Sequence, residues 1–513
     1  MVPGFAASIC AQSRAYRAPN MPTPPTSTPT DPAPAPAPAP TTLRKRNVLL
    51  MGGGAREHAL ALFISRSPFL NTLYTTHPDN PGLAALAKPV DVPVNIREIY
   101  RLKQFMEKKA IDLVVIGPED PLAEGFTDKL ASPTCLVFGP TKAGAQLEAD
   151  KAWAKQIMRG ASIPAGDSRT FTNAESARQY VESRERDVPL LALVFEQADR
   201  FRDPVDRREY ITNQVSATKE LKALYAAHRD DLPVIKAAGL AKGKGVVVPE
   251  TLNEALDAID QIMVRRIHGE AGAKIVIEEK LAGPEASVLA ITDGRTILVL
   301  PPAQDHKRLR DHDQGPNTGG MGAFCPTASI TPELMDKIES EVLVPTVDAL
   351  ARENILYRGV IFAGLMLTRT GPRVLEFNCR FGDPECQTIL PRLRSDLLEL
   401  IIATCEGRLH EVHVDWDPRP TCCVVLASEG YPEKPKLGQP ITGLQEAAAL
   451  PDVYVFHAGT KRAADGSTVT NGGRVLSVVA RGDTMEAARA RAYAAVAMIR
   501  FPGMQLRTDI AQS

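Results

Sequence analysis

Short apolar segments that alternate with helical segments constrain the fold of this chain more than any other feature of its sequence. An apolar segment at residues 47–51 precedes three glycines and a helical run at residues 55–65. Further strand-like segments occur at residues 72–76, 113–116 and 136–138. Strands that alternate with helices form right-handed β-α-β units around a parallel sheet. We therefore predict an open parallel α/β domain over residues 46–148.

The remaining length requires further domains. A single hydrophobic core stops growing at about 250–300 residues, and this chain has 513. Residues 149–392 contain strand-like runs joined by polar, glycine-rich loops, and residues 393–513 contain short strands followed by a helix. The sequence thus predicts an α/β protein with an N-terminal open parallel domain, a mixed central domain and a small C-terminal α/β domain.

Residues 1–45 differ in composition from the rest of the chain. Residues 22–40 are rich in proline, threonine and alanine and cannot bury enough apolar surface to fold, so we expect a disordered, extended leader. The segment before them contains Arg14 and Arg17 but no acidic residue, which fits an organelle transit peptide. A dispensable tail, with translation starting at Met21, fits equally well.

The charge balance and the hydropathy pattern exclude several classes of protein. Lys plus Arg number 60 and Asp plus Glu 61, so no nucleic-acid partner is expected. No segment approaches the roughly 20 apolar residues that cross a bilayer, so no membrane association is expected. The eight cysteines form no CxxC pair, which favours buried free thiols in a reducing compartment. We expect a soluble intracellular protein, cytoplasmic or, if residues 1–45 act as a transit peptide, plastid or mitochondrial.

The glycines at residues 52–54 lie between the first strand and the first helix. Glu57 stands where a dinucleotide-binding GxGxxG fingerprint has its third glycine, so an NAD-dependent oxidoreductase is disfavoured. The turn can still present N–H groups to an anion, and a phosphate site and a plain tight turn fit it equally well. Residues 117–122 follow the third strand, at the sheet edge where ligands bind. Both a substrate contact and a loop with capping acids are compatible with that segment.

A second glycine-rich loop joins two strands at residues 236–246. It contains three glycines and three lysines, Lys236, Lys242 and Lys244. Glycine lets the backbone approach a ligand closely and each ammonium group offsets phosphate charge, which favours a flap over a polyphosphate. The alternative is a solvated basic hairpin, whose tip rarely needs so many glycines.

The most polar part of the central domain is residues 304–322. Its glycines can direct N–H groups at an anion, and its carboxylates can receive an amine. Because apolar strands flank it closely, we predict a site rather than a connecting loop. The strand at residues 275–279 runs into a turn that can offer backbone groups to an adenine edge, and Glu285 follows on the next strand.

Residues 374–380 predict a metal site. Residues two apart in a strand face the same side, so Glu376, Asn378 and Arg380 should point into one cleft. Magnesium takes one or two carboxylates together with phosphate oxygens, and Glu376 and Asn378 supply suitable oxygens. Arg380 offers a fork for a phosphate or a carboxylate. An edge strand with a polar outer face does not account for the following Gly-Asp-Pro-Glu at residues 382–385.

Together these segments resemble the ATP-grasp ligases and, within them, the phosphoribosylamine–glycine ligases. The motifs that carry the resemblance are GGGAREHAL (52–60), GPEDPLAEG (117–125), KAAGLAKGKGV (236–246), IEEKLAGPEAS (277–287), AQDHKR (303–308), DQGPNTGGMGA (313–323), AGLML (363–367), LEFNCRFGDPE (375–385), FHAGT (456–460) and TNGGRVL (470–476). The resemblance covers residues 46–510. It implies an ATP-grasp fold at residues 149–392, with a small subdomain near 165–280, between the N-terminal domain and the C-terminal domain at residues 393–513.

The resemblance also implies a reaction. ATP would phosphorylate glycine to glycyl phosphate, and the amine of 5-phosphoribosylamine would displace the phosphate to give glycinamide ribonucleotide, ADP and phosphate in purine synthesis. Catalysis would rest on positioning and charge neutralisation. The implied cofactors are ATP and Mg²⁺ or Mn²⁺, the small-molecule partners are glycine and 5-phosphoribosylamine, and the expected state is a monomer or a weak homo-oligomer.

The resemblance assigns roles to particular residues. The ATP-binding residues would be Lys151, Lys236, Gly239, Gly243, Lys244, Gly245, Glu278, Glu279, Leu281 and Glu285. The metal ligands would be Glu376 and Asn378, and the groups around the reacting atoms would be Asp305, Lys307, Arg308 and Arg380. The substrate-binding residues would be Gly54, Asn80, Gly82, Glu119, Asn317, Thr318, Gly319 and Gly320.

The chain departs from the family pattern at three places. Ala55 replaces a usual glycine and Ala238 a usual aspartate, and residues 185–229 look like an insertion that enlarges the small subdomain. An ATP-grasp ligase for another carboxylate, such as a carboxylase subunit, and a degenerate nucleotide-binding scaffold remain alternatives. The loop at residues 315–320 beside AQDHKR weighs against the first. Lys236, Glu376, Asn378 and Arg380 weigh against the second.

Overall fold

The computed structural model describes residues 16–17, 44–185, 189–217, 219, 232–241 and 244–512. The predicted leader therefore lies almost wholly outside the described residues, apart from the two-residue strand β1 (Tyr16–Arg17) and residues 44–45. Gly243 of the predicted flap also lies outside them. Within the described part, no helix is long and apolar enough to cross a membrane.

The N-terminal part is a parallel sheet in the strand order β4-β3-β2-β5-β6. Its strands are β2 (Arg46–Met51), β3 (Leu70–Thr75), β4 (Lys88–Pro89), β5 (Leu113–Ile116) and β6 (Leu136–Phe138). Alternate residues of β2 belong to two separate hydrophobic cores. Val48 and Leu50 pack with α1 (Ala55–Ser65), and Leu49 and Met51 pack with α3 (Ile99–Lys108). Both faces of the sheet are covered, which explains why its central strands are continuous apolar runs.

The central sheet is antiparallel, in the order β1-β12-β11-β17-β18. Its long strands are β11 (Glu285–Thr292), β12 (Thr296–Val299), β17 (Gly359–Thr368) and β18 (Gly371–Asn378). The helices α7 (Lys151–Gly160) and α14 (Val344–Arg352) pack against this part. The parallel N-terminal sheet and this antiparallel sheet confirm the predicted α/β class.

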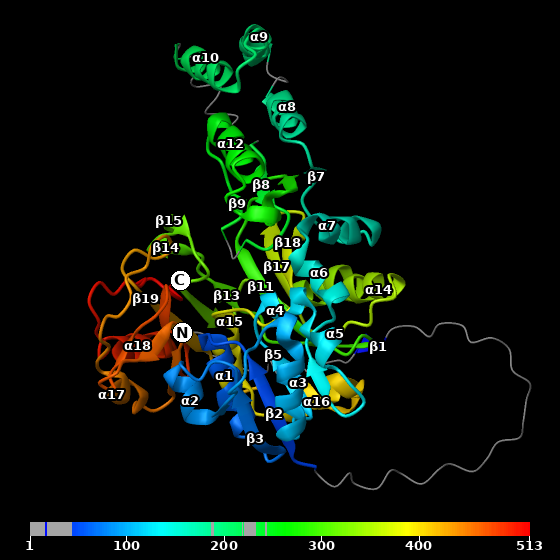
Figure 1. The fold of residues 1–513 in the computed structure, drawn as a ribbon. Coiled ribbons are helices and arrows are strands. Elements are labelled where there is room, and N and C mark those ends of the chain that lie inside the picture. Colours follow the sequence, from blue (N-terminus) through cyan, green and yellow to red (C-terminus); the bar gives the residue numbers. More distant parts are fainter. Residues whose placement is uncertain are drawn as a thin grey trace, which may run out of the picture.

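A smaller antiparallel sheet stands above the central one (Figure 1), in the order β7-β10-β8-β9. Its strands are β7 (Ser168–Phe171), β8 (Val234–Ala237), β9 (Val246–Val247) and β10 (Ile275–Glu278). Helices α8 (Ala174–Glu185) and α12 (Leu252–Ile259) cover one face through a core that includes Ile235 and Ile277. We call this sheet and its helices the small lobe.

The described part of the segment predicted to be an insertion forms two helices at the far end of the small lobe. They are α9 (Pro189–Ala198) and α10 (Pro204–Ala217), and they lie at the top of the molecule in Figure 1. Arg207 of α10 forms ion pairs with Glu182 of α8 and with Asp199. These two helices therefore dock on the small lobe, far from the N-terminal sheet, and the insertion itself stays a prediction.

The third large sheet has the order β13-β16-β19-β23-β20. Its strands are β13 (Gln304–Asp305), β16 (Gly322–Cys325), β19 (Thr421–Ala427), β20 (Val453–His457) and β23 (Arg474–Arg481), with α18 (Met485–Val496) packed against them. The two ends of the polar segment 304–322 are thus strands of the C-terminal sheet. Conversely, α16 (Leu397–Glu406) packs against β6 of the N-terminal sheet. The predicted domain boundaries stay predictions.

The described cysteines are buried free thiols, as the sequence predicted. They are the seven from Cys135 to Cys423. Their thiol pKa values are raised, chiefly by burial, as for Cys386 inside the N-terminal core. Such thiols are unreactive structural residues.

Candidate functional site

Glu376 and Asn378 lie at the carboxyl end of β18, on the side that faces several lysines. Desolvation acts to raise the pKa of Glu376, but the positive charges of Lys307, Lys151 and Lys236 outweigh it, so the pKa lies below its usual value. Glu376 is therefore ionised, and Asn378 beside it is 8% exposed. An anionic carboxylate and an amide oxygen at the end of one strand are suitable ligands for a hard divalent cation.

These two residues alone do not complete a coordination shell. Within the described part of the chain, no group of three or more His, Cys, Asp or Glu could hold a metal ion. Magnesium commonly binds through one or two protein carboxylates and completes its shell with water and phosphate oxygens. The residues present thus fit a metal that arrives with a polyphosphate and do not fit a dedicated protein cage.

Arg380 follows the two predicted metal ligands and is held by two carboxylates. Its Nε lies 3.3 Å from Glu119 Oε2 and its Nη2 lies 3.0 Å from Glu148 Oε1. Nη2 also donates to Asn378 Oδ1 at 3.2 Å. Arg380 therefore lies beside Asn378, and its guanidinium N–H groups already contact Glu119, Glu148 and Asn378. Its role toward a substrate anion stays a prediction.

The two carboxylates that hold Arg380 come from the N-terminal part of the chain. Glu119 is the first residue of α4 (Glu119–Glu124). Desolvation acts to raise the pKa of its carboxyl group, but the positive charges of Arg380 and Arg56 outweigh this effect and lower the pKa to about 2. Glu148, in α6 (Lys142–Ala149), accepts a hydrogen bond from the Cys379 N–H at 2.8 Å. The sequence predicted Glu119 as a substrate contact, and that role stays a prediction. Glu148 was not predicted at all.

Lys236 is paired with Glu278 beneath the predicted flap. Lys236 Nζ lies 2.6 Å from Glu278 Oε2 and donates to the Leu375 carbonyl at 3.2 Å. Glu278 is 1% exposed and also pairs with Lys155. The Glu278 side chain is thus the counter-ion of two lysines. Any contact of this segment with adenine would have to come from the backbone or from its neighbours Glu279 and Leu281.

Lys155 shares the counter-ion of Lys236 and was not among the predicted site residues. It lies one helical turn after the predicted Lys151 on α7, and residues four apart share a helix face. Lys155 is 5% exposed, and burial lowers its pKa despite the charge of Glu278. The i, i+4 spacing from Lys151 was the available signal.

The predicted flap connects β8 with β9, which pair antiparallel through Ile235 and Val247. A Cβ on Gly239 would lie 2.6 Å from the Ala271 backbone, and one on Gly245 would lie 2.6 Å from the Ala241 side chain. These two glycines are therefore required by packing at the base of the loop. Lys244 is exposed beside them. Both the phosphate flap and the basic hairpin remain compatible with this geometry.

Asp305 and Lys307 approach Glu376 from the polar segment. Lys307 Nζ lies 2.8 Å from Glu285 Oε2. Desolvation acts to lower the pKa of Lys307, but the negative charges of Glu285 and Glu376 stabilise the ammonium group and raise the pKa above its usual value. Desolvation and then the nearby Glu385 raise the pKa of Asp305 well above its usual value. Its Oδ1 is buried and has no hydrogen-bond partner among the described residues.

Asp305 and Glu385 make an acidic corner beside the cationic side chains of Lys307 and Arg474. Glu385 is 3% exposed and accepts a hydrogen bond from Ser287 Oγ at 3.0 Å. Gly320 closes the corner with a φ of 109°, and a Cβ there would lie 2.6 Å from Asp305 Oδ1. Glycine is required at this position because both its backbone angle and the available space exclude a side chain. The corner can receive the ammonium group of a small substrate.

The loop at residues 317–320 is tied to its surroundings by hydrogen bonds. Thr318 donates from its N–H and from Oγ1 to the Lys307 carbonyl, at 2.8 Å in both cases. The Gly319 N–H donates to Tyr431 Oη at 3.0 Å. Asn317 ends β15 (Gln314–Asn317) and pairs in register with Arg308 of β14 (Arg308–Arg310).

Arg308 and Arg474 both donate hydrogen bonds to backbone carbonyls, and the predicted role of Arg308 at the reacting groups stays a prediction. The Arg308 guanidinium donates to the Gly315 carbonyl at 2.8 Å, inside its own hairpin. Arg474, on β23, donates to the Gly319 carbonyl and, at 2.6 Å, to the Asp383 carbonyl. It ties the loop of the polar segment to the run 375–385. The sequence marked the motif TNGGRVL only as part of the C-terminal domain.

Three predicted substrate residues have structural contacts of their own. The Gly54 N–H donates to Glu57 Oε2 at 2.7 Å at the start of α1. Asn80 caps α2 (Pro81–Leu86) by accepting from the Gly82 N–H at 2.9 Å, and its amide donates to the Gly53 carbonyl at 2.9 Å. A Cβ on Gly82 would collide with the His58 ring. Packing explains Asn80 and Gly82, and a substrate role for them stays a prediction.

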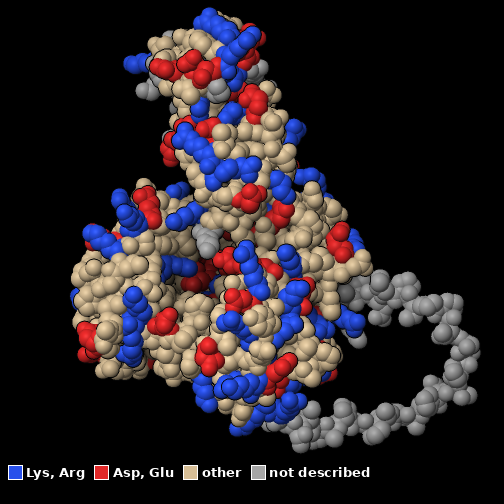
Figure 2. Space-filling model, viewed as in Figure 1, with Lys and Arg blue, Asp and Glu red and all other residues tan. Residues whose placement is uncertain are grey.

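The surface agrees with a mixed-charge cleft. Figure 2 shows a hollow below the small lobe, between the C-terminal part and the rest of the molecule, with acidic and basic side chains gathered at it. The contacts above bring together residues from the N-terminal helices, the small lobe, the central sheet and the C-terminal sheet. Such an arrangement can bind a metal–polyphosphate complex and a small zwitterion side by side.

Three family models match the chain. They are the phosphoribosylglycinamide synthetase N domain at residues 46–148, the ATP-grasp (A) domain of that synthetase at residues 205–386 and its C domain at residues 421–513. The ATP-grasp match begins inside the segment predicted to be an insertion. The three matches agree with the order of motifs in the sequence.

Relatives are similar over most of the chain. The phosphoribosylamine–glycine ligase of Rhodopirellula baltica is 45% identical over 470 residues, which are 91% of this chain and 98% of that protein. The trifunctional purine biosynthetic protein adenosine-3 of Drosophila melanogaster is 42% identical over 91% of this chain but 31% of its own length.

Solved structures show the same fold. The phosphoribosylamine–glycine ligase of Thermotoga maritima superposes with a TM-score of 0.69 at 29% identity, covering 90% of this chain and 99% of that one. A biotin carboxylase from Campylobacter jejuni gives a TM-score of 0.60 at 13% identity, covering 91% and 94%. The second likeness shows the fold alone.

Proposed function

The chain belongs to the phosphoribosylglycinamide synthetase family, and we infer that its reacting groups meet at the carboxyl end of β18. It joins glycine to 5-phosphoribosylamine at the expense of ATP, giving glycinamide ribonucleotide, ADP and phosphate in purine biosynthesis. The observation that supports the placement is the ionised Glu376, which lysines from three separate segments of the chain, Lys151, Lys236 and Lys307, stabilise.

The proposed chemistry has two steps. A glycine carboxylate oxygen attacks the γ-phosphorus of ATP, ADP leaves, and glycyl phosphate forms. The amine of 5-phosphoribosylamine then attacks the acyl carbon, the amine loses a proton, and phosphate leaves as the amide forms. Neither step needs a covalent bond to the protein, so the protein acts by positioning and by neutralising phosphate charge.

The residues divide into three groups in this proposal. Lys151 and Lys236 contact the phosphates of ATP under the flap, and Glu279 and Leu281 lie at the adenine edge. The acidic corner of Asp305 and Glu385 receives the ammonium group of glycine, since it has a buried oxygen with no hydrogen-bond partner among the described residues. Glycine would thus be held by its charge.

A divalent metal belongs to the reaction, and Mg²⁺ or Mn²⁺ is the proposed ion. Glu376 and Asn378 would hold it, and it would neutralise phosphate oxygens when bound. Arg380 keeps the Asn378 oxygen in place through its contact at 3.2 Å. Titrating a metal-free preparation with each ion, and measuring phosphate release, tests the choice.

The decisive test is phosphate release from ATP with glycine and freshly made 5-phosphoribosylamine. The paired change Glu376→Ala with Asn378→Ala should lower the rate by about 100-fold or more, because the site loses both metal ligands. Circular dichroism of the variant checks that it is folded. Phosphate release that needs no 5-phosphoribosylamine, or that survives the paired change, would sink the proposal.

Substitution of the carboxylate substrate tests the main alternative. A ligase for another carboxylate would release phosphate with bicarbonate or alanine in place of glycine. We expect neither to support the reaction, because bicarbonate has no ammonium group for the acidic corner and the similar proteins are named as ligases of glycine.

The cellular location depends on whether residues 1–45 are a transit peptide or a dispensable tail. A fusion of these residues to a fluorescent protein distinguishes the two interpretations. Import and cleavage would support a transit peptide, and a diffuse signal would support a dispensable tail.

A further inference from the structure

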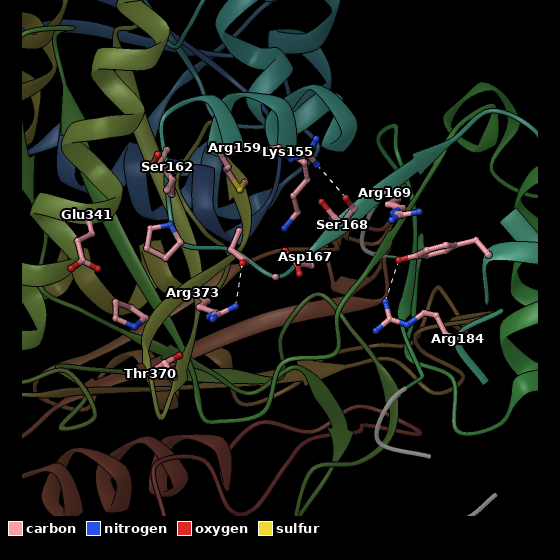
Figure 3. Close-up of a pocket in the computed structure, with 17 residues that line it drawn as sticks. Lys155, Arg159, Ser162, Asp167, Ser168, Arg169, Arg184, Glu341, Thr370 and Arg373 are labelled. Carbon is pink, nitrogen blue, oxygen red and sulfur yellow. Dashed lines mark hydrogen bonds between the residues drawn. The ribbon is translucent and has the colours of Figure 1, made fainter. Parts of the chain in front are cut away.

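A cavity of about 700 Å³ opens at the β7 edge of the small lobe (Figure 3). It is lined by α7, residues 162–168, β7, α8 and the turn between β17 and β18. β7 and β9 are the two opposite edges of the small-lobe sheet, and the flap leads into β9. None of the residues proposed above to bind substrates or metal lines this cavity.

The lining carries more positive than negative charge. Lys155, Arg159, Arg169, Arg184 and Arg373 line it, against the acids Asp167 and Glu341. Lys155 is matched by Glu278, and Arg373 lies 3.6 Å from Glu279. Within the described residues, Arg159, Arg169 and Arg184 form no ion pair with an acidic side chain. The unmatched positive charge therefore comes from α7, β7 and α8, one arginine from each.

The three arginines are held in place by neutral partners. Arg159 Nη2 donates to the Ser168 carbonyl at 3.1 Å, and Arg184 Nη1 donates to Tyr180 Oη at 3.1 Å. The Arg169 guanidinium lies over the Tyr180 ring, 4.8 Å from its centre. These contacts orient the guanidinium groups without neutralising them. A guanidinium fork matches the oxygens of a phosphate group.

A second cavity of about 310 Å³ adjoins the first and shares Arg159, Ser168 and Arg169 with it. Arg159 and Arg169 thus border both spaces. A single phosphate would fill only part of such a groove. An elongated molecule with several phosphate groups could contact all three arginines.

The floor of the cavity is bonded to the strand end that carries Glu279. The Asp167 carbonyl accepts from the Glu279 N–H at 2.8 Å, and the Asp167 N–H donates to Glu279 Oε2 at 3.2 Å. Arg373, on the opposite wall, contacts the same carboxylate. A ligand in the cavity would therefore touch the segment that we propose to border the adenine of ATP.

We propose that this cavity is a second binding site, for a small molecule that carries two or more phosphate groups, and that its occupancy changes the affinity for ATP. The proposed change in ATP affinity rests on the proposed function, whereas the binding of a phosphate-bearing molecule in the cavity does not depend on it. If both ligands bind, each must change the affinity of the other by the same factor. A nucleotide and an inorganic polyphosphate share the required chemistry.

Isothermal titration calorimetry with sodium tripolyphosphate tests the binding on the full chain. Lys236→Met weakens binding at the ATP site and should leave the binding at the β7 edge. Adding Arg159→Gln and Arg169→Gln to that variant should weaken the remaining binding at least tenfold. The matched control adds Arg101→Gln and Arg352→Gln, which remove the same charge at exposed positions outside the cavity. Equal binding by the two triple variants would overturn the site.

The same variants separate this site from the proposed function. Ligase activity that survives Lys236→Met would count against the assigned role of Lys236 and leave the tripolyphosphate result standing. Replacing tripolyphosphate by cytidine triphosphate distinguishes an inorganic polyphosphate from a nucleotide as the ligand. Equal affinity would show that the site recognises only the phosphates. Tighter binding of cytidine triphosphate would show that the site also recognises the nucleoside.

The effect on ATP is measured with the two double variants in an otherwise native chain. At fixed free metal, tripolyphosphate should shift the KM for ATP more in the native chain and in the Arg101/Arg352 control than in Arg159→Gln with Arg169→Gln. Simple competition at the ATP site would shift all three equally, and that outcome would overturn the coupling.

Discussion

At the scale of single residues, the site depends on charges that compensate one another. Glu376 stays ionised because lysines face it, and Arg380 stays in place because Glu119 and Glu148 hold it. Truncating one partner of such a pair leaves the other charge without compensation, which costs more than the pair contributes. Conservative changes that remove charge but keep shape are therefore the most informative.

The low pKa of Glu119 predicts a dependence of stability on pH. Its folded pKa of about 2 lies below its ordinary value of 4.5, so the unfolded chain binds more protons between these values. The stability that Glu119 contributes is present above about pH 4.5 and is lost as the pH falls through about 2. Glu119→Gln should flatten the fall in unfolding free energy over this window, measured by urea titration at several pH values. An unchanged slope would contradict the prediction.

At the scale of elements, α7 carries both Lys151 and Lys155 and depends on its cap. Asp150 accepts hydrogen bonds from the N–H groups of Ala152 and Trp153, at 3.0 and 3.1 Å. Its side chain satisfies donors that have no partner inside the helix. The position of the two lysines thus follows from the residue just before the helix.

Asp150→Ala should lower the unfolding free energy by about 1 kcal/mol and raise the KM for ATP. Thr484→Ala is the control, because Thr484 caps α18 in the same way and α18 carries none of the proposed site residues. The control should lose similar stability and keep the KM. Urea unfolding and steady-state kinetics measure the two effects, and a KM change in both variants would show a global effect instead.

Arg474 belongs to β23 but acts on two loops of other elements. Arg474→Gln should lower kcat by up to about 100-fold, because small displacements of positioned groups are costly. Hydrogen exchange of residues 315–320 should become faster in the variant, whereas the exposed control Arg462→Gln should leave both measurements unchanged. A loss of kcat without faster exchange would mean that Arg474 acts on substrate rather than on the loop.

At the scale of the whole molecule, the site exists only when several parts of the chain are folded against each other. Arg380 and Glu119 are 261 residues apart in sequence, and Arg474 and Gly319 are 155 apart. Ligands that bind only this assembled state stabilise the fold by mass action. Binding should therefore be visible as a change in thermal stability.

A non-hydrolysable ATP analogue with Mg²⁺ should raise the melting temperature of the full chain. A ligand at 100 times its Kd stabilises the folded state by about 2.7 kcal/mol. Removing the metal with EDTA should reduce the rise, because Glu376 and Asn378, the proposed ligands, would then have no metal to hold. In Glu376→Ala with Asn378→Ala, EDTA should make no difference, and a persistent metal effect in that variant would argue against these two ligands.

The sequence by itself determined the features that local patterns encode. The alternation of apolar strands and helices predicted the N-terminal sheet, and the spacing of Glu376 and Asn378 placed both at one strand end. The ordered motifs identified the family, which the relatives confirm. Local patterns suffice for these features because the period of a strand or helix fixes which side chains share a face.

Only the tertiary structure decided which charges meet. In the folded chain Glu278 forms ion pairs with two lysines, and Arg308 donates a hydrogen bond within its own hairpin. Arg474 of the C-terminal sheet contacts the polar segment. The tertiary structure also made the ends of that segment strands of the C-terminal sheet. These pairings join residues on separate elements, and their partners are set by how the elements pack, which no spacing along the chain records.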